Sequence, residues 1–99
     1  MLSIEKKTTA SELTVALSGR LDTVTSPELE KDLKESLPGV TALTIDMASL
    51  EYISSAGLRV LLSAQKTMNK QGEMKVVHVG ETIMEIFEVT GFSDILSIE

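Results

Sequence analysis

The sequence contains no cysteine and no tryptophan, and it has only three aromatic residues in a chain of 99. The absence of cysteine excludes a disulfide framework and a thiolate metal site. Aliphatic residues and the five methionines must therefore fill the core, and a hydrophobic content of 42% is sufficient for that purpose. A chain of this length is expected to form a single domain over residues 1–99.

Basic residues are scarce as well. Nine Lys and Arg residues stand against 15 Asp and Glu residues, which gives a net charge of −6. Sequence-independent binding to nucleic acids depends on clustered Lys and Arg, and so does docking on an anionic membrane. The charge balance therefore argues against both kinds of partner.

Long apolar runs are also missing. No run approaches the roughly 20 residues that a helix needs to cross a bilayer. The N-terminal stretch Met1–Lys7 lacks the hydrophobic region of a secretory signal peptide. These absences predict a cytoplasmic protein without membrane insertion.

The hydrophobic periodicity that is present predicts the order ββαβαβαβ. The expected helices are Ser26–Leu37, capped by Ser26, then Ala56–Gln71 and Glu81–Thr90. The expected strands are Leu2–Lys7, Glu12–Ser18, Thr41–Met47, Met74–Val79 and Ile95–Ile98.

Three connections have a predicted form. The segment Ala48–Glu51 is expected to be a turn that leads to the second helix. Gly72 is expected to end that helix in a left-handed conformation, and Gly91 is expected to close the third helix. Both glycines are therefore predicted to end a helix.

Strand alternation predicts how the layers are arranged. The second and third strands alternate apolar and polar residues, which is typical of a sheet covered on one face only. Strand–helix–strand crossovers are right-handed almost without exception, so successive helices are expected on the same face. We therefore predict an α/β domain with a mixed five-stranded sheet and helices packed on one face.

The stretch Tyr52–Leu62 joins the third strand to the second helix, with Ser54–Gly57 at the joint. The first amides of a helix lack intrahelical partners and attract anions. The other two predicted helices have acids near their starts, such as Glu28 and Glu81, but this one has none. We interpret its start as a helix end that is free for an added anion, such as a phosphoryl group on a serine.

This stretch resembles the signature loop of the bacterial anti-sigma factor antagonists, the small STAS-domain proteins of the sporulation and general-stress partner switches. Gly19–Asp22 is similar to the family's Gly-Glu-Leu-Asp, and Ile86–Phe92 is similar to its Leu-Phe-x-x-x-Gly-Leu. The resemblance spans nearly the whole chain and implies the STAS fold. Many members of the family have one more C-terminal helix, which would lie beyond Glu99.

The resemblance also implies a function. When the two are lined up on Gly57, the family's phosphoserine falls on Ser55 and its aspartate on Ser54, which makes Ser54 the second choice as acceptor. Family members bind an anti-sigma factor serine kinase when unphosphorylated, are released by phosphorylation and are reset by a serine phosphatase. They thereby control sigma-factor-dependent transcription. The expected partner-binding residues are Asp22, Thr23, Ser54, Ser55, Ala56, Gly57 and Arg59.

Several of these residues have a structural alternative. Ser55 could be an ordinary helix cap, and Gly57 could serve packing of the helix on its own sheet instead of close approach by a partner. Asp22 could cap its own turn, Thr23–Thr25. Arg59 could be solvated instead of pairing with a phosphoserine or an acidic partner. All these alternatives remain open at the level of sequence.

Other functions find less support in the residues. The one histidine, His78, is expected to pack in or beside the core, and there is no Ser-His-acid pattern, P-loop or dinucleotide motif. We therefore expect no enzyme, no cofactor and no metal site. The alternative function is a free-standing STAS subunit of a membrane transport system, and a serine hydrolase is the remote third option.

Overall fold

The computed structural model describes residues 2–99, so Met1 of the predicted domain lies outside the described residues. Within residues 2–99 no helix is both long and apolar enough to span a bilayer. The chain forms, in order, β1 (Leu2–Thr9), β2 (Glu12–Leu21), α1 (Ser26–Ser36), β3 (Ala42–Ile53), α2 (Ser55–Gln71), β4 (Glu73–Val77), α3 (Glu81–Thr90) and the 3-10 turn η1 (Phe92–Asp94).

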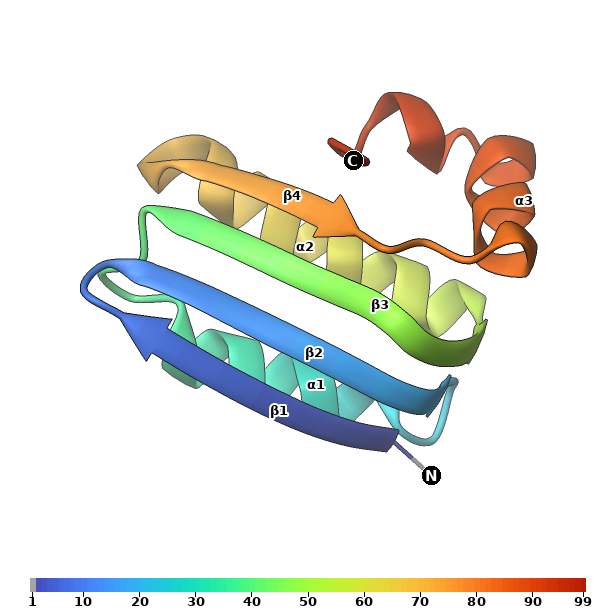
Figure 1. Ribbon diagram of the computed structural model, residues 1–99, viewed down its shortest axis with the longest axis horizontal. Coiled ribbons are helices and arrows are strands. Elements are labelled where there is room, and N and C mark those ends of the chain that lie inside the picture. Colours follow the sequence, from blue (N-terminus) through green and yellow to red (C-terminus); the bar gives the residue numbers. More distant parts are fainter. Residues whose placement is uncertain (1) are drawn as a thin grey trace.

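The sheet is mixed, with the strand order β1-β2-β3-β4 (Figure 1). β1 and β2 form an antiparallel hairpin, whereas β2 with β3 and β3 with β4 are parallel pairs. Figure 1 shows α1 and α2 behind the same face of the sheet and α3 beyond the end of β4. The predicted mixed sheet is therefore confirmed, and α1 and α2 share one face as expected, whereas α3 lies at the end of the sheet.

The predicted fifth strand is wrong. The described residues form a four-stranded sheet, and of the expected strand Ile95–Ile98 only Ile98 makes a bridge, which is parallel to Val76. Two hydrogen bonds flank this bridge, one from Val76 N to the Ser97 carbonyl at 2.8 Å and one from Glu99 N to the Val76 carbonyl at 2.9 Å. The amides of Ile95 and Leu96 both donate to the Phe92 carbonyl, so the first half of the expected strand belongs to the turn that follows Gly91 and only a bridge forms.

The core lies between the sheet and the helices. Alternate residues of β2 and β3 point into it, and their neighbours on the other face are at least partly exposed. Burial of these aliphatic side chains supplies the main driving force for folding. The most deeply buried side chains include Val15, Leu17, Leu21, Leu29, Leu43, Ile45, Met47, Leu61, Met68, Ile83 and Phe87.

The turn predicted at Ala48–Glu51 is instead part of β3, which continues to Ile53. The pairing of β2 with β3 shifts register twice, and each time β3 supplies the extra residue. A β-bulge of this kind leaves a residue unpaired and interrupts the alternation of faces. Ala48 and Ser49 are consequently both exposed, a pattern that suggests a turn when only the sequence is read.

Gly72 ends α2, but not in the predicted left-handed conformation. Its φ of 171° is extended backbone, which any residue adopts. A Cβ at this position would overlap the carbonyl of Thr41, and Glu73 N donates to that same carbonyl at 3.0 Å. Gly72 therefore permits a close backbone approach. Gly91, with φ of 81°, closes α3 as predicted.

Candidate functional site

Two loops meet where β2 and β3 end. Because these strands are parallel neighbours, both chains leave the sheet at the same edge, and Leu21 pairs with Ile53 at the last position of each strand. The amide of Ser54 then donates to the Leu21 carbonyl at 2.9 Å. The turn Asp22–Thr25 therefore lies beside the start of α2 (Figure 1).

Ser54 caps α2, so the interpretation of Ser55 as the helix cap is wrong. Ser54 has extended backbone angles, and its Oγ accepts a hydrogen bond from Gly57 N at 3.5 Å. This distance is longer than that of a typical N–H···O bond, so the cap is weak. Ser55 is the first helical residue, and its side chain is exposed.

The electrostatic character of this helix start is as predicted. The first turn of α2 contains no acidic residue, whereas Glu28 lies in the first turn of α1 and Glu81 in that of α3. The amides at a helix N-terminus carry a partial positive charge that stabilises a negative group nearby. The start of α2 can therefore accommodate an anion without repulsion from its own side chains.

Gly57 allows the start of α2 to pack closely on the sheet. The residue is buried, and a Cβ at this position would lie 2.8 Å from Ile53 Cγ1 and 2.8 Å from Leu21 Cγ. Real Cβ atoms do not approach other heavy atoms so closely, so a larger residue would push the helix away. The structure therefore supports the packing interpretation of this glycine.

The carboxylate of Asp22 holds its own turn together. Its Oδ1 accepts hydrogen bonds from Val24 N at 3.0 Å and Thr25 N at 3.1 Å, and Asp22 N donates to Thr25 Oγ1 at 2.9 Å. The bond from the Thr25 amide is the largest cause that lowers the pKa of Asp22 below its ordinary value. The structure thus agrees with the turn-capping interpretation of Asp22.

The N-cap predicted for α1 is shifted by one residue. Thr25 occupies the N-cap position, without a capping bond from its side chain, and Ser26 is the first helical residue. The hydroxyl of Ser26 is buried and donates to the Asp22 carbonyl. Ser26 therefore ties α1 to the turn before it.

The surface formed by the two loops is shallow and carries both polar and apolar side chains. Thr23, Ala56 and Arg59 line one depression of about 180 Å³, together with residues of α1. Val24, at the tip of the turn, is 85% exposed. Of the predicted partner-binding residues, Thr23, Ser55 and Arg59 are exposed, Asp22, Ser54 and Ala56 are partly buried, and Gly57 is buried.

Comparison with known proteins agrees with this architecture, because the model of the STAS domain family matches residues 3–99. The chain belongs to the STAS domain family. Its sequence is 29% identical over 102 residues to the anti-sigma-B factor antagonist of Listeria monocytogenes, which covers 99% of this chain and 89% of that protein.

Solved structures share the fold of this STAS domain. An anti-sigma factor antagonist from Mycobacterium paratuberculosis superposes with a TM-score of 0.89 at 24% identity, over 99% of this chain and 85% of that one. SpoIIAA, an anti-sigma factor antagonist solved in its unphosphorylated form, gives a TM-score of 0.85 at 15% identity, over 98% and 88% of the two chains. The Bacillus protein SpoIIAA in its phosphorylated form gives 0.77 at 15% identity, over 98% and 91%.

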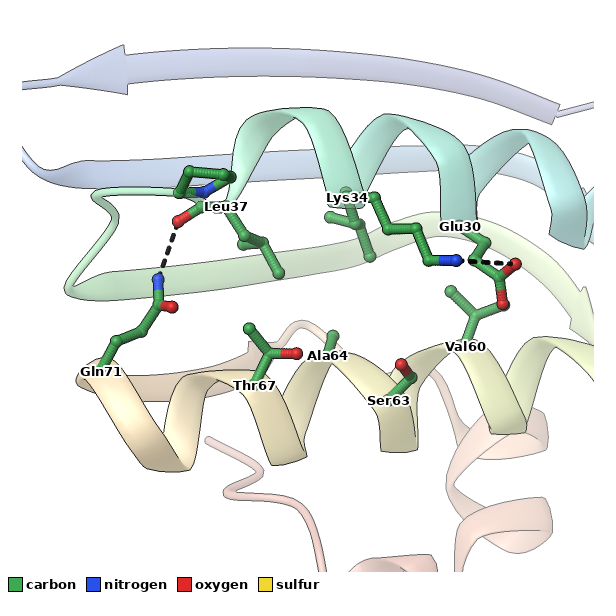
Figure 2. Close-up of a pocket in the computed structure, with 10 residues that line it drawn as sticks. Glu30, Lys34, Leu37, Val60, Ser63, Ala64, Thr67 and Gln71 are labelled. Carbon is green, nitrogen blue, oxygen red and sulfur yellow. Dashed lines mark hydrogen bonds and ion pairs between the residues drawn. The ribbon is translucent and has the colours of Figure 1, made fainter.

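This STAS domain also has a cleft that the sequence analysis missed. It lies between α1 and α2 and encloses about 370 Å³ (Figure 2). Lys34 Nζ and Glu30 Oε1 are 3.8 Å apart near one end, and Gln71 Nε2 donates to the Leu37 carbonyl at 2.7 Å at the other. The sequence signal was the series of small side chains facing α1, at helical spacing: Val60, Ser63, Ala64 and Thr67.

The prediction for His78 is wrong. Its side chain is 66% exposed, and Nδ1 lies 3.0 Å from Asp46 Oδ1 on the face of the sheet away from α1 and α2. His78 also has a φ of 57°, in the left-handed region. This conformation turns the chain out of β4, so the alternation of the strand no longer determines where the side chain lies.

Proposed function

We propose that this STAS domain is an anti-sigma factor antagonist. In its unmodified form it binds an anti-sigma factor that is a serine kinase, and the kinase releases it by phosphorylating Ser55. A serine phosphatase restores the unmodified form, and the cycle controls sigma-factor-dependent transcription. The observation that carries the proposal is an exposed serine at the first residue of a helix whose first turn has no acid. The curated relative from Listeria, named an anti-sigma-B factor antagonist, supports the same class of function.

Ser55 is a better acceptor than Ser54 on structural grounds. The Ser55 hydroxyl is exposed, as a kinase requires, whereas Ser54 is half-buried and its oxygen accepts the capping bond. A phosphoryl group on Ser54 would disturb that cap and crowd the backbone hydrogen bond from the Ser54 amide to the Leu21 carbonyl. Modification of Ser55 leaves both intact.

The partner surface in this proposal combines rigid and exposed parts. Thr23, Val24, Ala56 and Arg59 supply contacts around Ser55. Asp22 and Gly57 act from beneath, because the first holds the turn and the second sets the position of α2. A surface that is already ordered loses little conformational entropy when it binds.

Phosphorylation is expected to act on the interface and not on the fold. A phosphoryl group adds nearly two negative charges at neutral pH, and a helix N-terminus tolerates them. In a complex the same group would have to lose its hydration against a partner that fits a neutral hydroxyl, which is costly. The free protein thus remains folded while the complex dissociates.

The experiment that tests this function is phosphorylation in vitro. The purified protein is incubated with Mg-ATP and the anti-sigma factor kinase of its source organism, and phosphopeptides are mapped by mass spectrometry. We expect one phosphoryl group on Ser55, none in Ser55→Ala and normal modification of Ser54→Ala. Phosphate on Ser55→Ala but not on Ser54→Ala would assign the acceptor to Ser54, and no modification of the parent protein would refute the proposal.

A further inference from the structure

Arg59 lies one helical turn after Ser55 on α2. Residues at positions i and i+4 of a helix are neighbours on the same face, with their Cβ atoms about 5–6 Å apart. Both side chains are exposed, so neither has to leave the core for the two to meet. The guanidinium group of arginine matches the geometry of a phosphoryl group and binds it through two parallel hydrogen bonds.

Within the part of the chain that the structure describes, Arg59 has no ion-pair partner. The four ion pairs found within residues 2–99 do not include it. The acid that shares its depression is Glu30 of α1, and this carboxylate lies 3.8 Å from Lys34. The structure thus leaves a cation without an ion pair on the same helix face as the proposed acceptor.

The other two charged groups beside the joint, Asp22 and Arg20, are already engaged. Asp22 accepts the amide hydrogens of its own turn, and its second oxygen lies 3.8 Å from Arg20 Nε. The guanidinium of Arg20 in turn stacks over the ring of Tyr52, 4.3 Å from its centroid. Of the two arginines beside the joint, Arg59 is therefore the one that remains available to a new anion on Ser55.

We propose that Arg59 forms an intramolecular ion pair with the phosphoryl group on Ser55. The inference rests on the proposed function, because it requires a phosphate at that serine. In the unmodified protein Arg59 is free to meet an acidic group of the kinase. Phosphorylation occupies Arg59 within its own helix, so modification both adds negative charge to the surface and withdraws the cation from the partner.

The pairing is tested with phosphoserine installed at position 55 by genetic encoding, which needs no kinase. Phosphorus-31 NMR titration then gives the pKa of the second ionisation of the phosphate. In the parent protein we expect this pKa to be about 0.3 pH units lower than in Arg59→Gln, the size expected of an i,i+4 ion pair. Lys66→Gln, which removes an exposed cation further along α2, serves as the matched control and should titrate like the parent.

Equal titration of the parent and Arg59→Gln would overturn the pairing. Because the phosphoserine is genetically encoded, this result is independent of whether a kinase modifies Ser55, so the two proposals fail separately. The withdrawal of Arg59 from the partner has its own measurement, the affinity for the kinase with and without the phosphate. The loss of affinity on phosphorylation should be about fivefold smaller in Arg59→Gln than in Lys66→Gln, and an equal loss would refute this part.

Discussion

The two loops at the ends of β2 and β3 leave the same edge of the sheet, yet they use their polar groups differently. In the turn Asp22–Thr25, a carboxylate accepts two backbone amides and a threonine hydroxyl, so its bonding capacity is largely used within the loop. At the start of α2 the cap is a single hydrogen bond of 3.5 Å, and no acid lies in the first turn. We call the first loop closed, because its polar groups already bond to one another, and the second loop open. Only the open loop can take up a new charge without first losing an existing hydrogen bond.

The largest expected effect comes from placing a phosphoryl group at the start of α2, and it is a loss of affinity for the partner. Phosphoserine at position 55 should weaken binding to the anti-sigma factor kinase by roughly a hundredfold or more, because each 1.4 kcal/mol of clash and desolvation costs about tenfold in affinity. The melting temperature of the free protein should move by no more than about 5 °C. Titration calorimetry and melting curves of both forms provide the measurement. Strong binding by the phosphorylated protein, or unfolding on modification, would contradict the interpretation of the start of α2 as an open loop.

The next effect concerns the glycine that sets the open loop against the sheet. Gly57→Ala should destabilise the protein by about 1–3 kcal/mol, the usual cost of overpacking, because its Cβ would collide with Leu21 and Ile53. Thermal or denaturant unfolding measures this loss. Gly80→Ala is the matched control, since a Cβ at the N-cap of α3 meets nothing within 4 Å. If Gly57→Ala were as stable as Gly80→Ala, the packing interpretation would be wrong.

The smallest effect probes the closed loop through its charge. The pKa of Asp22 in the folded protein lies below its ordinary value of 3.8, chiefly because the Thr25 amide donates to it. A lowered pKa contributes stability that is fully present above the unfolded pKa and is lost as the pH falls through the folded one. The parent should therefore be more stable than Asp22→Asn near pH 6, and the difference should shrink as the pH falls below 3.8.

Unfolding by urea at several pH values measures this effect. Ser54→Ala is the control, because it removes a neutral cap and should change stability by a similar amount at every pH. A pH-independent difference between the parent and Asp22→Asn would show that the carboxylate charge contributes nothing to the turn.

The elements that periodicity predicted well are those with a regular alternation. The apolar positions of β2, including Leu13 and Val15, point to the core as expected. The errors fall where tertiary contacts override the local pattern. Bulges in β3 made Ala48–Glu51 resemble a turn, and the left-handed His78 left its strand. The short bridge at Ile98 depends on where η1 ends, which no local pattern specifies.

The candidate site was predictable in position but not in detail. Parallel neighbouring strands must end at the same edge, so the meeting of the Asp22 turn with the serine joint follows from topology. The choice between Ser54 and Ser55 as cap could not be made, because a serine is suitable at either position. The close approach of Gly57 to Leu21 and Ile53, which leaves no room for a side chain, is likewise visible only in three dimensions.

The hydrogen bond from the Ser54 amide to the Leu21 carbonyl links two segments that are far apart in the chain, with all of α1 between them. Pairing β2 with β3 closes this long loop, and such non-local contacts form slowly because the loss of chain entropy comes before the gain. A chain emerging from the ribosome has the serines but not the surface around them until β3 has docked. Under the proposed function, a partner would therefore bind only the folded protein, and a misfolded copy would not bind the kinase.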